Sequence, residues 1–244
     1  LVLRDESPWD ALTPIFTCDL AGSVSIAVHR TRPSRVFAVR AYPERSGDKI
    51  LKILQKVQHP NVISTKDIYK HGEVLYSVGV DRPLTLDNLV ACDRFPSELQ
   101  LASILAQVLN GISYLLANGW EHQAIEYSNI LLGLDGLIEI AALEHCVEHQ
   151  LDQSQSRSLS ALTTVTTLLM QKYVKADGAI GIDNVDCWSI GSEPVEFLSA
   201  TTSVVTIEDL KLHPFIAKSR WSPGELIGLV RLALISTHTF ITSP

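Results

Sequence analysis

Apolar and polar residues alternate along the first third of the chain, and this period of two indicates half-buried β-strands. Turn residues such as Ala21-Gly22 and His71-Gly72 separate the runs, as in a meander of antiparallel strands. One stretch differs, because from Ser46 to Gln58 the apolar residues recur at helical spacing, until Pro60 ends the pattern. The pattern therefore predicts one helix among five strands, at residues 14–19, 23–28, 36–40, 62–69 and 73–80.

Beyond Arg82-Pro83 the apolar positions follow the period of a helix. Ser97 and Gln100 form a capping box, and the apolar residues behind them keep helical spacing as far as Asn118-Gly119. A second capping signal, Ser222-Pro-Gly-Glu225, predicts a last helix that runs through residue 235. We therefore expect a mainly helical second part.

Two shorter segments lie between these helices. A strand is expected at residues 137–140, and a mobile loop in the Ser/Thr/Gln-rich stretch 153–167. The elements divide the chain into a β-rich part, residues 1–80, and a helical part, residues 81–244, with residues 81–90 as the hinge between them.

Composition narrows the classes of partner. The net charge is −7 and no block of basic residues occurs, so we expect neither nucleic acid nor a membrane surface as partner. Lys49, Lys52 and Lys56 recur at helical spacing and are expected on a solvated helix face. The four cysteines are scattered without a C-x-x-C pair, which favours free thiols in a reducing, cytoplasmic compartment. We also expect no signal peptide and no membrane span.

The segment His122-Gln-Ala-Ile-Glu-Tyr-Ser-Asn-Ile-Leu-Leu132, which follows the long helix, resembles the catalytic loop of protein kinases, H-R-D-L-x-x-x-N. In that register Ala124 stands at the catalytic Asp, Glu126 stands at the usual Lys, and Asn129 is retained. Further motifs follow the family's order along the chain. They are Gly22-Ser-Val24 (end of the Gly-rich loop), Phe37-Ala-Val-Arg40 (V-A-I-K), His59-Pro-Asn61, Val185-Asp-Cys-Trp-Ser-Ile-Gly191 (D-x-W-S-x-G) and His213-Pro-Phe-Ile216.

This resemblance to the protein kinase family implies an α+β, kinase-like bilobal fold. Its small N-lobe would hold a five-stranded antiparallel sheet and one helix, and its C-lobe would be mainly helical. The resemblance also implies that Asp186 caps the backbone of the catalytic loop and that Trp188 belongs to the core. A residual nucleotide cleft would be formed by Gly22, Val24, Ala38, Arg40, Asn129 and Leu131.

The departures from the family pattern fall on the reacting groups. Ala124 cannot accept a proton, and Ala142, which stands at the Asp of D-F-G, cannot hold a cation. Ile50 stands where the helix glutamate belongs, so Arg40 lacks its usual partner. We expect Arg40 either to grip a phosphate or to pair with another acid. The resemblance thus predicts a pseudokinase that is not an enzyme and that binds ATP weakly or not at all, with no metal site.

Such a chain would serve as a protein-interaction or allosteric module. The expected partner is a protein, either an active kinase or another domain of the same chain. Two enzymatic alternatives stay open. One is an unconventional ATP-dependent transferase that uses Arg40 and Asn129. The other is a zinc hydrolase with the H-x-x-E-H motif at His145, Glu148 and His149, for which Glu193 or Glu196 would be the third ligand.

Overall fold

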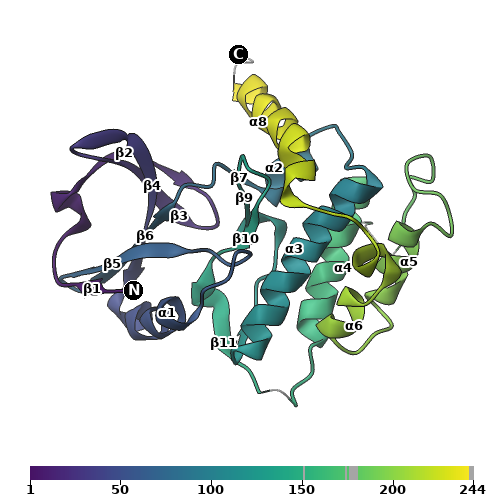
Figure 1. Cartoon of the computed structure of the whole chain (residues 1–244), viewed down its shortest axis with the longest axis horizontal. Helices are drawn as coiled ribbons and strands as arrows, with labels where there is room; N and C mark the ends of the chain where they lie inside the picture. Colours follow the sequence, from purple (N-terminus) through teal and green to yellow (C-terminus); the bar gives the residue numbers. More distant parts are fainter. Residues whose placement is uncertain (151, 174, 176–180, 242–244) are drawn as a thin grey trace.

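The chain folds into a sheet-rich N-terminal part and a helical C-terminal part, which lie side by side (Figure 1). The computed structural model describes residues 1–150, 152–173, 175 and 181–241. The element order confirms the expected α+β fold class, with a sheet-rich first part and a mainly helical second part. The division at residue 80, where strand β6 ends, stays a prediction.

The N-terminal sheet has six strands in the order β1-β5-β6-β4-β3-β2. The five predicted strands are present, but the sheet is mixed rather than purely antiparallel, because β1 pairs parallel with β5. Strand β1 was not predicted, because a two-residue strand is too short to show an alternating pattern. The strands are β1 (Leu3–Arg4), β2 (Leu12–Asp19), β3 (Ser23–His29), β4 (Arg32–Pro43), β5 (Thr65–His71) and β6 (Val74–Val80).

Helix α1 (Glu44–Lys56) is the predicted helix among the strands. Its buried face consists of Ile50, Ile53 and Leu54, which pack against the sheet and against the segment that follows β10 (Ile138–Ile140). The apolar Ile50, placed where a kinase has its helix glutamate, therefore serves the core rather than the cleft.

Helix α3 (Glu98–Ala117) is the centre of the C-terminal part (Figure 1). Its predicted capping box forms, with Ser97 Oγ accepting from the backbone of Gln100 and the Gln100 side chain accepting from the backbone of Ser97. The helix is long and apolar enough to cross a bilayer, yet most of it is buried inside the protein, as in the core helix of a globular domain. The helices around it are α2 (Leu86–Ala91), α4 (Ser156–Gln171), α5 (Glu193–Ala200), α6 (Ile207–Lys211), α7 (Pro214–Ala217) and α8 (Ile227–Ile241), with the 3-10 turn η4 (Pro223–Leu226) before α8.

Helix α4 occupies the Ser/Thr-rich stretch that we expected to be a mobile loop, so that expectation is wrong. Some hydroxyl side chains fit inside this helix because they bond to carbonyls one turn back, as Thr163 does to Leu159 at 2.9 Å and Thr166 to Leu162 at 2.7 Å, although the buried Ser158 hydroxyl has no partner among the described residues. Leu162 and Val165 are buried against the rest of the lobe. Composition alone suggested a loop, whereas satisfied hydroxyls allow a core helix.

The expected role of Asp186 is also not observed. Residues 185–191 form turns rather than a helix, and Asp186 is exposed to solvent. Trp188 does belong to the core, and its indole Nε1 donates to the Met170 carbonyl at 2.8 Å. The segment that resembles D-x-W-S-x-G is therefore a turn after α4, which Trp188 holds against the core. The buried helix expected for this motif is absent there, and α4 is the buried helix of this region.

Candidate active site

Three short strands form a small sheet between the N-terminal and the C-terminal parts of the chain. They are β7 (Leu84–Thr85), β9 (Ile130–Leu132) and β10, in the order β10-β9-β7. A second pair joins β8 (Trp120–His122) to β11 (Cys146–Glu148), with the 3-10 turn η3 (Leu143–His145) before β11. The predicted catalytic loop runs from His122, at the end of β8, to Asn129, just before β9, and Figure 1 shows β9 beside the N-terminal sheet.

The turn between β2 and β3 is the counterpart of the Gly-rich loop, and it is tightly folded. The Asp19 carboxylate accepts from the Gly22 amide at 3.1 Å, and the Leu20 amide donates to the Gly22 carbonyl at 3.0 Å. Ala21 and Gly22 both have left-handed φ angles, 57° and 90°. Glycine adopts this conformation freely, so Gly22 suits its place, whereas Ala21 is held there by its surroundings.

Arg40, on β4, binds this turn from inside. Its guanidinium donates to the Ala21 carbonyl at 2.7 Å and to the Leu20 carbonyl at 2.5 Å. The side chain is buried, and its Nε has no hydrogen-bond partner. Burial lowers the pKa of Arg40, against the raising influence of Tyr42 and Glu144. Arg40 thus contacts carbonyls, where we expected either a phosphate or an acid.

The two turn residues held by Arg40 fill the inner end of the cleft. Ala21 is buried in a cluster with Leu131, Ala141 and Ala142, and Leu20 packs against the same cluster. Ala142, which stands at the metal-binding Asp of the family, is therefore covered by the protein's own turn. Of the other predicted cleft residues, Val24 and Ala38 are also buried.

His122 connects the catalytic loop to the segment at Ala142. Because the Ala124 amide donates to Nδ1 at 3.2 Å, the ring proton lies on Nε2, which donates to the Ala141 carbonyl at 2.8 Å. Burial is the largest cause that lowers the pKa of His122 to about 4, with a smaller lowering from His145. Asn129 completes the loop by donating its side-chain amide to the Ala124 carbonyl at 3.1 Å. Glu126 is exposed on the same loop.

Two residues that the motif comparison missed lie at the inner end of the cleft. The Glu144 carboxylate oxygen lies 3.8 Å from where a Cβ on Gly22 would be. Lys49, on α1, donates to the Glu144 carbonyl at 2.7 Å and to the Cys146 carbonyl at 3.0 Å. Lys49 is therefore not on a solvated face, contrary to our expectation. Glu144 stands where the D-F-G motif of the family has its glycine. The comparison of motifs therefore counted this position as a lost glycine and overlooked the carboxylate that it adds.

The outer end of the cleft is open. A cavity of about 640 Å³ lies between the apolar face of the sheet and the segment that leads into α2. Its apolar side is formed by Phe16, Ile26, Val28 and Val36, and its polar side includes Asp81, Asp87 and Asn88. Thr237 of α8 also lines it, since its hydroxyl accepts from the Asn88 amide at 3.4 Å. None of the predicted cleft residues lines this cavity.

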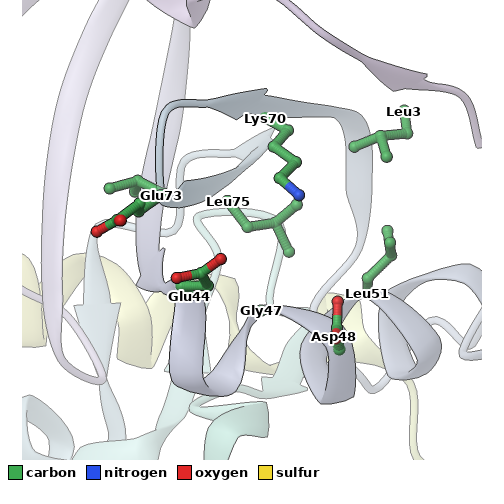
Figure 2. A pocket seen from close by; sticks show the side chains of 9 residues that line it. Leu3, Glu44, Gly47, Asp48, Leu51, Lys70, Glu73 and Leu75 are labelled. Atoms are coloured by element: carbon green, nitrogen blue, oxygen red, sulfur yellow. The ribbon is translucent and has the colours of Figure 1, made fainter.

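A second cavity lies on the other side of α1, away from the cleft. Figure 2 shows Lys70 reaching toward α1 above Leu75, with Glu44 and Glu73 beside it. Its volume of about 70 Å³ holds a few water molecules at most, so a nucleotide would not fit.

The segment with the H-x-x-E-H pattern is not a helix. His145 ends η3, and residues 146–148 form strand β11. Residues four apart in an extended segment are about 13 Å apart, so the two histidines do not share a metal site. The expected third ligands, Glu193 and Glu196, lie on α5, where their charges act on His213. Among the described residues, no group of three or more His, Cys, Asp or Glu side chains forms a metal site. The geometric premise of the zinc alternative is therefore wrong.

Comparison with known families gives the assignment. Residues 21–213 match the model of the protein kinase domain, which covers well over half of the chain. The chain belongs to the protein kinase family. The kinase match includes the turn at Ala21, Arg40, the loop from His122 to Asn129 and Glu144.

Several protein kinases are similar over most of the chain. Serine/threonine-protein kinase ste20 of Emericella nidulans is 26% identical over 165 residues, which are 68% of this chain and 19% of that protein. Serine/threonine-protein kinase pakA of Talaromyces marneffei is 25% identical over 165 residues, 68% of this chain and 25% of that protein. Cyclin-dependent kinase F-3 of Oryza sativa subsp. japonica is 22% identical over 148 residues, 58% of this chain and 32% of that protein. The matched region thus spans less than a third of these relatives.

The prediction that the chain is not an enzyme is wrong, because its family and its relatives are protein kinases. The error lay in equating missing side chains with missing activity. Ala124 and Ala142 do remove a base and a metal ligand. Kinase chemistry, however, consists mainly of positioning and charge stabilisation, so the loss of these two side chains does not by itself establish inactivity.

Proposed function

We propose that the chain is a kinase-like, ATP-dependent transferase with a reorganised site. The observation that carries this proposal is Arg40, a buried cation at the inner end of an inter-lobe cleft, with one polar atom unsatisfied. In the proposed complex the base and sugar of the nucleotide occupy the outer cavity, and its phosphates reach Arg40.

The outer cavity suits this role. Its volume falls within the range of small-molecule sites, and one side is apolar, as a purine ring requires. The Asp87 carboxylate on the opposite side offers an acceptor to the hydroxyls of a ribose. The inner end is filled by Leu20 and Ala21, so the phosphates enter only when this turn moves.

The magnesium ion that the family uses has a poorer fit. Ala142 carries no ligand, so the Asn129 side-chain oxygen is what is left of the family's metal ligands, and a lone neutral amide is a poor site for an ion that prefers carboxylates and phosphates. The residues present therefore do not form the family's magnesium site, and we propose no step that depends on it.

The chain's own residues still offer a route to transfer. Arg40 would hold phosphate oxygens through its planar fork, which suits that geometry. A loose transition state needs little help from a base, so the absence of Asp at position 124 would slow the reaction by a factor of roughly 10²–10⁴ rather than abolish it. We propose Glu144 as proton acceptor, because the other nearby carboxylate, Asp19, already binds the Gly22 amide.

The acceptor of the transferred group is proposed by likeness to the relatives. Those relatives are named serine/threonine-protein kinases, so we propose a serine or threonine hydroxyl of a protein. A protein partner follows as a proposal from the same likeness, and a cytoplasmic location is proposed from the free cysteines.

The test is transfer of labelled phosphate from ATP to the chain itself and to a generic protein substrate, with nucleotide affinity measured by calorimetry. We expect slow transfer, reduced at least tenfold in Arg40→Met and in Glu144→Gln. Arg35→Met is the matched control, because Arg35 is an exposed arginine of the same strand. Absence of both binding and transfer at millimolar ATP would contradict the proposal.

A further inference from the structure

We infer that the turn Asp19–Gly22 is a latch that closes the phosphate end of the cleft, held by Arg40 and released when a nucleotide enters. This inference rests on the proposed function only for the identity of the ligand. The latch itself is a property of the free chain.

The polarity of the turn is the first argument. Phosphates are bound by loops that point amide N–H groups at them. Here the carbonyls of Leu20 and Ala21 point inward, toward the Arg40 guanidinium, at 2.5 and 2.7 Å. A phosphate at this place would face two carbonyl oxygens, and the Arg40 guanidinium would already be bonded to them. The turn must therefore reorient before a phosphate binds.

Occupancy is the second argument. The Leu20 and Ala21 side chains pack against Leu131, Ala141 and Ala142, so they fill the floor on which phosphates would lie. The closed turn thus blocks the site by volume as well as by charge. It also covers the segment whose carbonyls are bound by His122.

Two features indicate that the closed turn can open. Ala21 has a φ of 57°, which a non-glycine residue adopts at an energetic cost. Arg40 has its Nε buried without a partner, so the closed state leaves one polar atom unsatisfied. A phosphate that approached Arg40 could satisfy this atom and take over the two bonds now made to carbonyls.

A closed turn in the free chain reduces the apparent affinity for the nucleotide. A ligand that binds only the open form pays for opening, and its dissociation constant rises by the inverse of the open fraction. Destabilising the closed turn without touching the phosphate-binding cation should therefore tighten nucleotide binding.

Hydrogen–deuterium exchange of the Leu20 and Gly22 amides tests the latch without any nucleotide, because both amides are bonded in the closed turn. We expect Arg40→Met and Leu20→Ala each to speed this exchange at least tenfold, while Arg35→Met leaves it unchanged. Leu20→Ala keeps Arg40 in place, so it provides a second variant if Arg40→Met does not fold. Unchanged exchange in the folded variants would overturn the latch.

Binding of a non-hydrolysable ATP analogue separates this inference from the proposed function. We expect Leu20→Ala to bind the analogue at least tenfold more tightly than the wild type. Equal affinity of the two proteins would overturn the latch and leave the proposed function standing. Faster exchange in Leu20→Ala, with no analogue bound by any variant, would support the latch and contradict the proposed function.

Discussion

Two arginines lie beside the cleft, Arg40 buried and Arg82 partly buried, and their partners differ. Arg82 follows strand β6. Its guanidinium pairs with Glu139, with Nε 2.8 Å from one carboxylate oxygen, and also contacts Asp135 at 3.1 Å. Arg40 binds only backbone carbonyls among the described residues, at 2.5 and 2.7 Å. The pKa of Arg82 is raised, because the hydrogen bonds and charges of the two acids outweigh burial, whereas burial lowers the pKa of Arg40.

This difference separates a structural cation from one available for binding. The Arg82–Glu139 pair ties the hinge to β10, and both charges are compensated inside the protein. In the part of the chain that the structure describes, no carboxylate contacts Arg40 to neutralise its charge. A buried charge in that condition is costly unless a ligand compensates it, which is why we assign Arg40 to the phosphates.

The largest expected effect comes from breaking the compensated pair. Glu139→Ala would leave the Arg82 charge buried without its main partner, and we expect a loss of about 3–5 kcal/mol in the free energy of unfolding. Urea denaturation followed by tryptophan fluorescence would measure it. Asp135→Asn is the control, because this acid is 61% exposed and its pair should be worth at most about 1 kcal/mol. Equal losses in the two variants would show that burial does not distinguish them.

Another base, the buried His122, gives a pH-dependent effect of intermediate size. Its pKa is lowered from 6.5 to about 4, so the folded chain keeps the ring neutral where the unfolded chain protonates it. The resulting stability is fully present above pH 6.5 and is lost as the pH falls from 6.5 to about 4. Over this range the shift corresponds to about 3 kcal/mol.

The measurement is the unfolding free energy of the wild type and of His122→Phe at several pH values between 4 and 7. Their difference isolates His122 from other groups, including Glu139, whose raised pKa makes its own contribution change in the opposite direction as the pH falls. A difference that does not depend on pH would contradict the assignment of a neutral, buried ring.

Periodicity predicted much of the fold. The strands β2–β6, helix α1 and the capped helix α3 appear close to the expected residues because each has a regular apolar pattern. Helix α4 was missed because its threonines and serines resemble a loop in composition, and only the structure reveals the carbonyls that accept from Thr163 and Thr166. Asp186 was misplaced because a motif match fixes no secondary structure.

Less of the candidate site could be predicted. The sequence indicated that Arg40 and Asn129 belong to the cleft. The motifs, however, concern only the functions that the family's side chains have at their positions. The motif comparison therefore missed Lys49, whose partners are backbone carbonyls 95 and 97 residues away, and the turn at Leu20, whose inward fold depends on Arg40. Contacts to backbone carbonyls carry no sequence signal at the acceptor.

The smallest stability effect is expected from Arg40→Met, and it completes the comparison. The substitution removes a buried charge together with its two bonds, and the carbonyls left behind belong to a turn that can rotate toward water. Because burying a charge without an ionic partner is itself costly, its removal offsets the loss of the two bonds, and we expect a change within about 1 kcal/mol. Arg82→Met should instead cost several kcal/mol, since it leaves the Glu139 carboxylate buried and unpaired.

Urea midpoints of the two variants, measured side by side, check this difference in stability. A large loss in Arg40→Met would mean that Arg40 holds the fold together as Arg82 does, and the assignment of its charge to a ligand would then lose its basis.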